Sequence, residues 1–341
     1  FIARHASCRT LCTDRCRFVL HITLHPLVST VNSFNAGFCM LPEFTFDPAD
    51  RAPFSPMPAR TPLRWPNGAR VAVWVVPNVE HYEYLPRPSK KRDPWPRMPH
   101  PDVIGYGTRD YGNRVGIWRM FDLFDRLDIR ATVSLSMANW VHYPEIFRAM
   151  EARKWSIMCH GMYNTRYHWD MSEAEERAAI AECTDLYGEL TGRQLRGWFS
   201  PAASYTMNTP DLVAEAGISY YSDWHHDDQP LPLRVRNGSL ISVPYTMDFN
   251  DSILHRQQFE AVDYASQSRD AFDTLYAEGG QVMCLALHPY MMGQPHRIAH
   301  LAGLLEYIKG HDGVWMATGE EIADWYLTEC QDHIAWHRAQ R

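Results

Sequence analysis

Residues 155–168 read WSIMCHGMYNTRYH, and the apolar run within them ends abruptly at Cys159, before His160 and Gly161. A short, continuous apolar run is typical of a strand that is buried on both faces of a parallel sheet. His160 would then lie at the carboxyl end of that strand, where α/β folds gather polar side chains into a site. The stretch therefore predicts an α/β fold with His160 as a candidate functional residue, although a histidine with a structural role in the core fits the same pattern.

The composition limits the classes of function. The chain has 341 residues, 45% apolar content and a net charge of -7. An acidic chain without a long basic run is not expected to bind nucleic acid, and no apolar stretch is long enough to span a bilayer. Beyond residue 39 the cysteines are widely scattered, which favours reduced core thiols and a cytoplasmic protein.

The first 39 residues differ from the rest. They hold four of the eight cysteines and a single acidic residue, with no periodicity. We interpret residues 1–39 as a leader outside the fold; a transit peptide, or metal ligation by Cys8, Cys12 and Cys16, are the alternatives. The proline-rich residues 40–67 are expected to form an extended arm, which would suit a subunit contact in a homo-oligomer.

Apolar runs alternate with helical patterns over residues 68–330, and residues 331–341 are interpreted as a tail. The predicted strands are residues 70–77, 131–135, 156–159, 195–200, 218–223, 240–245, 282–287 and 314–317. The predicted helices are residues 114–127, 144–153, 172–192, 209–216, 257–278 and 296–309, with a last one from residue 320. About seven strand–helix units imply a parallel sheet, and this number favours a barrel over an open sheet.

Polar side chains follow several of these strands. In a barrel the carboxyl ends of the strands share one rim, so we expect such side chains to converge. The groups are Asn78 and Glu80, His160 and Asn164, Ser200, residues 223–228, and His288.

Six segments resemble the polysaccharide deacetylase (NodB-homology) superfamily in order and spacing. They are PNVEHYE, CHGMYN, GWFSPAAS, SDWHHDD, LALHPYMMGQPHR and GVWMATGEEIADW, spread over residues 64–326. The resemblance implies a distorted (β/α)7-type barrel that hydrolyses N-acetyl amides.

The departures from the family pattern are informative. Asn78 and Glu80 stand where the family has a pair of aspartates, and Asn164 stands at its second metal histidine. Asparagine cannot act as a base and is a poor zinc ligand, so Glu80 and His160 leave two good donors where a catalytic zinc site usually has three. We therefore expect no cofactor; a divalent metal such as zinc, if bound, would use Glu80, His160 and Asn164. The altered set resembles the metal-independent allantoinases and cyclic imide hydrolases, in which this barrel opens a cyclic ureide or imide.

Hydrolysis of an amide without a metal needs a base for water, donors for the developing oxyanion, and an acid for the leaving nitrogen. Glu80 can be the base and His288 the acid, while His160 or Asn78 orients the water or polarises the carbonyl. A salt bridge at the barrel mouth is the alternative for Glu80, and a buried structural role is the alternative for His288.

The remaining candidates are substrate contacts. Arg297 could hold a substrate carboxylate or carbonyl, or form a salt bridge at a helix start. Residues 225–228 (HHDD) could replace the metal site, contact substrate or anchor a loop. The expected substrate-binding residues are Asn78, His81, Asn164, Trp198, Ser200, Asp227, Asp228 and Arg297.

The leading hypothesis is a hydrolase of non-peptide carbon–nitrogen bonds that opens a small cyclic amide. The second is a metal-dependent carbohydrate or peptidoglycan N-deacetylase. The third is a catalytically inactive barrel that binds a small ligand; retention of Glu80, His160 and His288 together argues against it.

Overall fold

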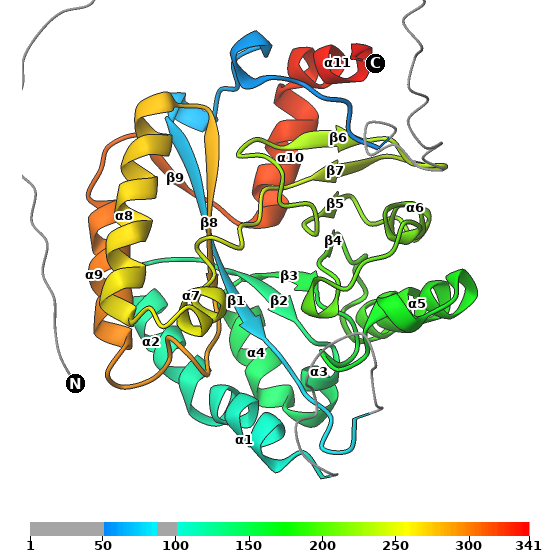
Figure 1. Cartoon of the computed structure of the whole chain (residues 1–341), viewed down its shortest axis with the longest axis vertical. Coiled ribbons are helices and arrows are strands. Elements are labelled where there is room, and N and C mark those ends of the chain that lie inside the picture. The colour runs from blue at the N-terminus through cyan, green and yellow to red at the C-terminus, as the bar shows by residue number, and fades with distance from the viewer. Residues whose placement is uncertain (1–50, 87–100, 341) are drawn as a thin grey trace, which may run out of the picture. The chain divides into compact units, whose positions relative to one another are not determined.

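Figure 1 shows the computed structural model of the chain, which describes residues 51–86 and 101–340. The predicted leader, the first part of the predicted arm and residues 87–100 lie outside the described residues. The described part of the arm contains two short 3-10 turns, Met57–Ala59 and Pro66–Gly68. Arg51 and Arg60 form ion pairs with Asp211 and Asp227, which fasten the arm to the rest of the protein.

Nine strands form one sheet in the described part of the chain. They are β1 (Val71–Val79), β2 (Thr132–Leu135), β3 (Ser156–Cys159), β4 (Gly197–Trp198), β5 (Tyr220–Tyr221), β6 (Leu231–Leu233), β7 (Leu240–Ser242), β8 (Gln281–Leu287) and β9 (Val314–Met316). Their order is β6-β7-β5-β4-β3-β2-β1-β8, with β9 also paired to β1, and every pair is parallel except β6 with β7. The sheet curls into a barrel that is not fully closed, which confirms the predicted distorted α/β barrel (Figure 1).

The long strand β1 organises the sheet. Along residues 71–77 it pairs with β8 on one side. On the other side its first residues pair with β9, and its last residues, Asn78 and Val79, pair with β2. All nine residues are buried, as expected for a strand covered on both faces. The end of β1 therefore lies between β8 and β2, at the point where the polar residues begin.

Eleven α-helices accompany the described strands. They are α1 (Val103–Tyr111), α2 (Ile117–Arg126), α3 (Ala138–His142), α4 (Pro144–Ala152), α5 (Glu173–Thr191), α6 (Thr209–Glu215), α7 (Asp251–Arg256), α8 (Ala261–Glu278), α9 (Ile298–Lys309), α10 (Gly319–Glu329) and α11 (Gln331–Ala339). A helix follows seven of the nine strands, the exceptions being β5 and β6. The predicted capping box of Ser172 and Glu175 opens α5, and Gly192, at φ 67°, ends it.

The sequence patterns misplace several boundaries. The strands expected around residues 195–200 and 218–223 shrink to two residues each, and β6 is an additional strand. The helix expected from residue 257 begins at Ala261, because α7 is a separate helix before it. Asn250 caps α7 by accepting from two backbone N–H groups, and Gln258, at φ 68°, interrupts the helical path between α7 and α8.

The apolar residues form two clusters on opposite sides of β1, because successive side chains of a strand point to opposite faces. Val73 and Val75 belong to the cluster beneath the surrounding helices. Trp74 belongs to the cluster inside the barrel, together with Phe199 and Tyr245. The inner cluster is rich in aromatic residues and lies directly below the polar residues at the rim of the barrel.

The last helix, α11, contributes buried histidines to the fold, although its residues were interpreted as a tail. His333 contacts Tyr326 (Nδ1–Oη 2.9 Å), and the Nε2 atoms of His333 and His337 lie 3.3 Å apart. Burial is the largest cause that lowers the pKa of His333 to about 3 and that of His337 to about 4. For His333 the next cause is the charge of His337, and the charge of Arg60 lowers the pKa of both histidines. Both are therefore neutral in the folded protein at physiological pH.

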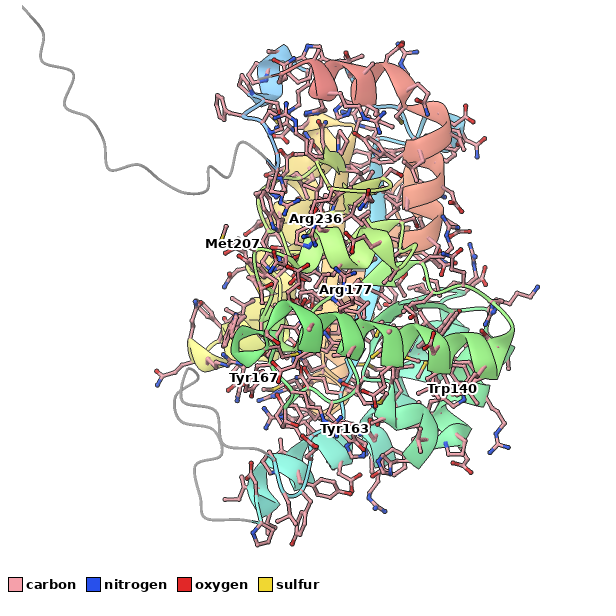
Figure 2. All side chains as sticks on the ribbon, turned by 90° about the vertical axis from the view of Figure 1, so that its right-hand side faces the viewer. Trp140, Tyr163, Tyr167, Arg177, Met207 and Arg236 are labelled. Carbon is pink, nitrogen blue, oxygen red and sulfur yellow. The ribbon has the colours of Figure 1, made fainter. Side chains whose placement is uncertain are left out.

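Figure 2 shows the face of the molecule that carries α5, with Arg177 and Arg236 close together. Both guanidinium groups contact Oε1 of Glu173, at 3.2 Å and 2.9 Å. Exposed ion pairs of this kind contribute little stability each, and here they connect the start of α5 to the segment between β6 and β7. None of the described helices is long and apolar enough to cross a membrane.

Candidate active site

Three side chains that follow different strands meet at one rim of the barrel. Glu80 follows β1, His160 follows β3 and His288 follows β8. The Nε2 atoms of His160 and His288 lie 3.7 Å and 3.5 Å from Oε1 of Glu80. None of the three side chains is more than 7% exposed. The convergence follows from the position of β1 between β8 and the β2–β3 pair.

Asp251, the first residue of α7, holds His288 in place. Its Oδ1 accepts from Nδ1 of His288 over 2.6 Å, and its Oδ2 accepts from the backbone N–H of His288 over 2.7 Å. Burial alone would lower the pKa of His288, but the negative charges of Asp251 and Glu80 outweigh it and raise the pKa to about 9. His288 is therefore an imidazolium at neutral pH, with its Nε2–H directed to the site.

Glu80 is the counterpart of this imidazolium. Asn164 donates from Nδ2 to Oε1 of Glu80 over 2.6 Å. Burial alone would raise the pKa of Glu80, but the positive charge of His288 holds it well below the usual range. Oε2 of Glu80 is buried and has no hydrogen-bond partner within the described residues. Glu80 is thus a carboxylate whose Oε2 is available to accept a hydrogen bond or a proton.

His160 is fixed by the strand next to its own. Its Nδ1 lies 2.9 Å from the carbonyl oxygen of Phe199, and its ring stacks on the ring of Phe199 with centroids 4.8 Å apart. A carbonyl oxygen only accepts, so Nδ1 carries the proton. In the neutral ring, Nε2 is then an acceptor that faces the site near Glu80.

These groups line a small cavity of about 100 Å³. Asn78 lies in its wall and donates from Nδ2 to the hydroxyl of Tyr245 over 2.9 Å and to the carbonyl of Leu287 over 3.1 Å. The other lining residues are Tyr82, Phe199, Ala202, Ala203, Met247, Asn250, Ser252, Ile253, Arg256 and Tyr290. The cavity therefore has an aromatic wall around one buried acid–base pair.

Comparison with known proteins assigns this arrangement to a family. The family description "Polysaccharide deacetylase" matches residues 100–221. The crystal structure of a probable polysaccharide deacetylase from Pseudomonas aeruginosa PAO1 has 31% sequence identity and a TM-score of 0.69, covering 78% of this chain and 94% of that chain. The chain belongs to the polysaccharide deacetylase family.

Two further proteins extend the comparison. The crystal structure of PuuE allantoinase has 30% identity and a TM-score of 0.70, covering 81% of this chain and 96% of that chain. A Schizosaccharomyces pombe protein named as a polysaccharide deacetylase is 29% identical over 294 residues, 76% of this chain and 91% of its own length. The predicted family is confirmed. Deacetylases and allantoinases both cleave non-peptide carbon–nitrogen bonds, and this protein is a hydrolase of that class.

Many deacetylases of the family use a metal ion, so the donor set deserves a direct test. Asn164 donates from its amide nitrogen to Glu80, so this nitrogen cannot bind a metal. Its Oδ1 has no partner among the described residues, but a neutral amide oxygen is a poor zinc ligand. His288 carries a proton and a positive charge. Glu80 and His160 are left as the two donors, and the described residues contain no group of three His, Cys, Asp or Glu side chains arranged to hold an ion. The residues present therefore do not fit a catalytic metal ion.

Trp198 and Ser200, expected to contact substrate, lie beneath the cavity rather than in its lining. Nε1 of Trp198 donates to Oγ of Ser200 over 3.1 Å. Ser200 in turn donates to Asp223 from its hydroxyl (2.7 Å) and from its backbone N–H (2.8 Å). These hydrogen bonds are satisfied internally, so both residues hold the end of β4 in place and neither has a free group for a ligand.

His81 lies outside the cavity. Neighbouring residues of an extended segment point to opposite sides, so the side chain next to Glu80 faces away from it. The ring of His81 lies 4.5 Å from that of His142 and 5.6 Å from that of Tyr143, in a separate pocket of about 680 Å³.

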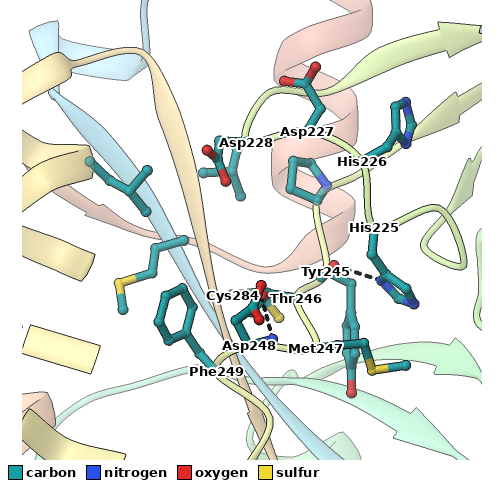
Figure 3. Close-up of a pocket in the computed structure, with 14 residues that line it drawn as sticks. His225, His226, Asp227, Asp228, Tyr245, Thr246, Met247, Asp248, Phe249 and Cys284 are labelled. Carbon is teal, nitrogen blue, oxygen red and sulfur yellow. Dashed lines mark hydrogen bonds between the residues drawn. The ribbon is translucent and has the colours of Figure 1, made fainter. Parts of the chain in front are cut away.

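Asp227 and Asp228 line another cavity, of about 350 Å³, which Figure 3 shows between the segment after β7 and strand β8. Asp227 pairs with Arg60 (Oδ2–Nη2 2.5 Å), which fits the loop-anchoring alternative. His225 contacts the carbonyl oxygen of Tyr245 through Nδ1 at 2.8 Å (Figure 3). None of these acids reaches the cavity that holds Glu80.

Arg297 also lies elsewhere. Its Nη2 is 3.6 Å from Oε2 of Glu260 and 3.4 Å from Nδ1 of His255, beside the start of α9. The helix-start salt bridge was the alternative interpretation of this residue, and the geometry fits that alternative.

Sequence reasoning missed Asp251, Tyr245 and Arg256. Asp251 is 37 residues from its partner His288 and follows a stretch without periodicity. The one available signal was the sequence Asn250-Asp251-Ser252, which has the form of a helix start and so could have placed an acid at the rim after β7.

Proposed function

We propose that the protein opens a small cyclic amide, such as a ureide or an imide, by general acid–base attack of water without a metal ion. The observation that carries the proposal is the buried pair of Glu80 and His288, an anion and a cation 3.5 Å apart with Asp251 behind the cation. The similarity to PuuE allantoinase supports the cyclic substrate.

Glu80 is the base in this proposal. Its unpartnered Oε2 can accept a proton from water, and Nε2 of His160 can accept the second hydrogen and orient the molecule. The resting carboxylate is a weak base because the positive charge of His288 lowers its pKa. When His288 loses its proton, that charge disappears and Glu80 becomes more basic, so the two proton transfers assist one another.

His288 is the acid. An imidazolium at neutral pH can protonate the departing nitrogen through Nε2, and without that proton the nitrogen would have to leave as an amide or ureide anion, which is a poor leaving group. Asp251 keeps the other ring nitrogen bonded and favours return of the proton from solvent. The second role considered for His160, polarising the carbonyl, does not suit an Nε2 that accepts.

The size of the cavity supports a ring over a polymer. About 100 Å³ bounded by Tyr245, Tyr290 and Met247 suits a compact molecule. A cyclic imide also needs less electrophilic help than an acetamide, which matches a donor set without a metal. N-deacetylation of a carbohydrate or peptidoglycan is the second candidate, favoured by the family name.

The test is a hydrolysis screen of the purified protein over cyclic ureides, cyclic imides and N-acetyl sugars, each with and without chelator, together with metal analysis. The proposal expects turnover of at least one ring substrate that survives chelation. Turnover restricted to N-acetyl sugars and dependent on added metal would establish the deacetylase instead.

A further inference from the structure

Arg256 is the last residue of α7, the helix whose first residue holds His288. Ser252 and Arg256 are four residues apart and therefore share one face of this helix. Both line the cavity that contains Glu80 and His288. Ser252 is buried and Arg256 is exposed, so the face runs from the interior of the cavity to its rim.

The guanidinium group of Arg256 has no ion pair or hydrogen bond with any residue that the structure describes. By contrast, Arg60 pairs with Asp227 and Arg297 pairs with Glu260. An arginine offers five N–H donors in a planar fork that matches a carboxylate or a carbonyl pair. At the rim of a catalytic cavity, a fork of donors without a protein partner can bind a ligand.

The cavity has opposite polarity at its two ends. In its interior, Oε2 of Glu80 and Oδ1 of Asn164 are buried acceptors without a partner among the described residues. Their side chains are 6% and 1% exposed, and both line the cavity. A ligand that forms hydrogen bonds with these two oxygens must place O–H or N–H donors in the interior. At the rim, the guanidinium group of Arg256 needs an oxygen acceptor on the ligand. The charge of His288 is already balanced by Glu80 and Asp251, so Arg256 is the cation of the lining that has no acid beside it among the described residues.

We propose that Arg256 binds an oxygen acceptor on the substrate, a carboxylate or a ureido carbonyl, on the side of the ring away from the bond that is cleaved. The inference rests on the proposed function, since it names the side group of the same cyclic amide. It assigns to Arg256 the recognition that the sequence suggested for Arg297.

The experiment measures binding apart from turnover. The background is Glu80→Gln, in which hydrolysis is slow on the timescale of a titration. Calorimetry compares three probes with the same five-membered ureide ring: one carries a carboxymethyl group, one a ureido group and one a methyl group. Each probe is titrated into Glu80→Gln alone and combined with Arg256→Gln, Arg256→Lys or Arg297→Gln. Arg297→Gln is the matched control, because it removes the same charge outside the cavity.

The proposal expects the carboxymethyl or the ureido probe to bind at least about tenfold more tightly than the methyl probe, and Arg256→Gln to remove most of that preference. Arg256→Lys should keep more of the preference for the carboxymethyl probe than for the ureido probe, since it keeps the charge and loses the fork. Arg297→Gln should change nothing.

Equal binding of all three probes, or a preference that survives Arg256→Gln, would overturn the inference. A preference lost equally in Arg256→Gln and Arg297→Gln would also overturn it, because general charge would then explain it. Failure of the proposed function looks different: the unsubstituted protein would hydrolyse no ring, whatever the probes show about Arg256.

Discussion

Asp251→Asn tests the acid half of the proposed mechanism. The change keeps the size of the side chain but removes the charge that contributes most to raising the pKa of His288 to about 9. The pKa should fall toward its ordinary value of about 6.5. At pH 8, a group with a pKa of about 9 is about 90% protonated, and one with a pKa of about 6.5 is only about 3% protonated. The loss of kcat/KM should therefore approach about 30-fold at pH 8 and be less than about twofold at pH 6.

The assay is the pH profile of kcat/KM from pH 5 to pH 10 on the best ring substrate. The unsubstituted protein should show a basic limb near pH 9, and Asp251→Asn should move this limb down by up to about 2.5 pH units. Asp223→Asn is the matched control, because Asp223 is another buried aspartate at the rim that accepts from a backbone N–H, yet it holds Ser200 and not His288.

A loss that is uniform over the whole pH range would show that Asp251 matters only for structure. A basic limb that stays near pH 9 in Asp251→Asn would mean that His288 is not the group that must be protonated. Either result would refute the reasoning about the acid.

Three further predictions follow from the same structure. Glu80→Gln and His288→Asn should each lower kcat by roughly 10²–10⁴-fold with KM little changed, and the double variant should lose far less than the product of the two, as kinetics on a ring substrate will show. The purified protein should hold less than one zinc per chain and keep its activity in chelator; stoichiometric zinc in metal analysis would contradict this. The pKa values of His333 and His337 in the folded protein lie below the value of about 6.5 in the unfolded chain. Their contribution to stability is therefore complete above about pH 6.5 and is lost as the pH falls toward 3 to 4. The loss is up to about 1.4 kcal/mol per pH unit for each histidine. Urea unfolding at several pH values should show this loss, and His337→Asn should reduce its slope.

The sequence was sufficient to predict the barrel and the residues that immediately follow its long strands. Glu80, His160 and His288 could be placed together because parallel strands end at one rim, and the apolar runs before them are unambiguous. The short strands β4 and β5 were predicted too long, because an apolar run does not tell how many of its residues pair.

The direction in which a side chain points was harder to predict from the sequence than its position after a strand. His81 follows Glu80 by one residue, and that single step turns it to the opposite side of the chain. Asp227 follows β5 as expected, but its direction is set by Arg60, 167 residues earlier in an arm without periodicity. No local pattern encodes such a partner, which is why acids that follow a strand were taken for substrate contacts when one of them anchors the arm.

Asn78 and Asn164 explain why the cavity is lined by a single acidic side chain. Asn78 donates to the carbonyl of Leu287 over 3.1 Å, so an aspartate at this position would set a carboxylate against a carbonyl oxygen and close to Glu80. Asn164 donates to Glu80 over 2.6 Å, where an acceptor would repel the carboxylate instead. Both positions therefore require a donor, and Glu80 is left as the single acid that lines the cavity. The charge that balances it is the proton on His288, and Asp251 keeps that proton in place. In the proposed reaction the balancing charge is therefore mobile, and its transfer to the leaving nitrogen is what releases Glu80 to act as a base.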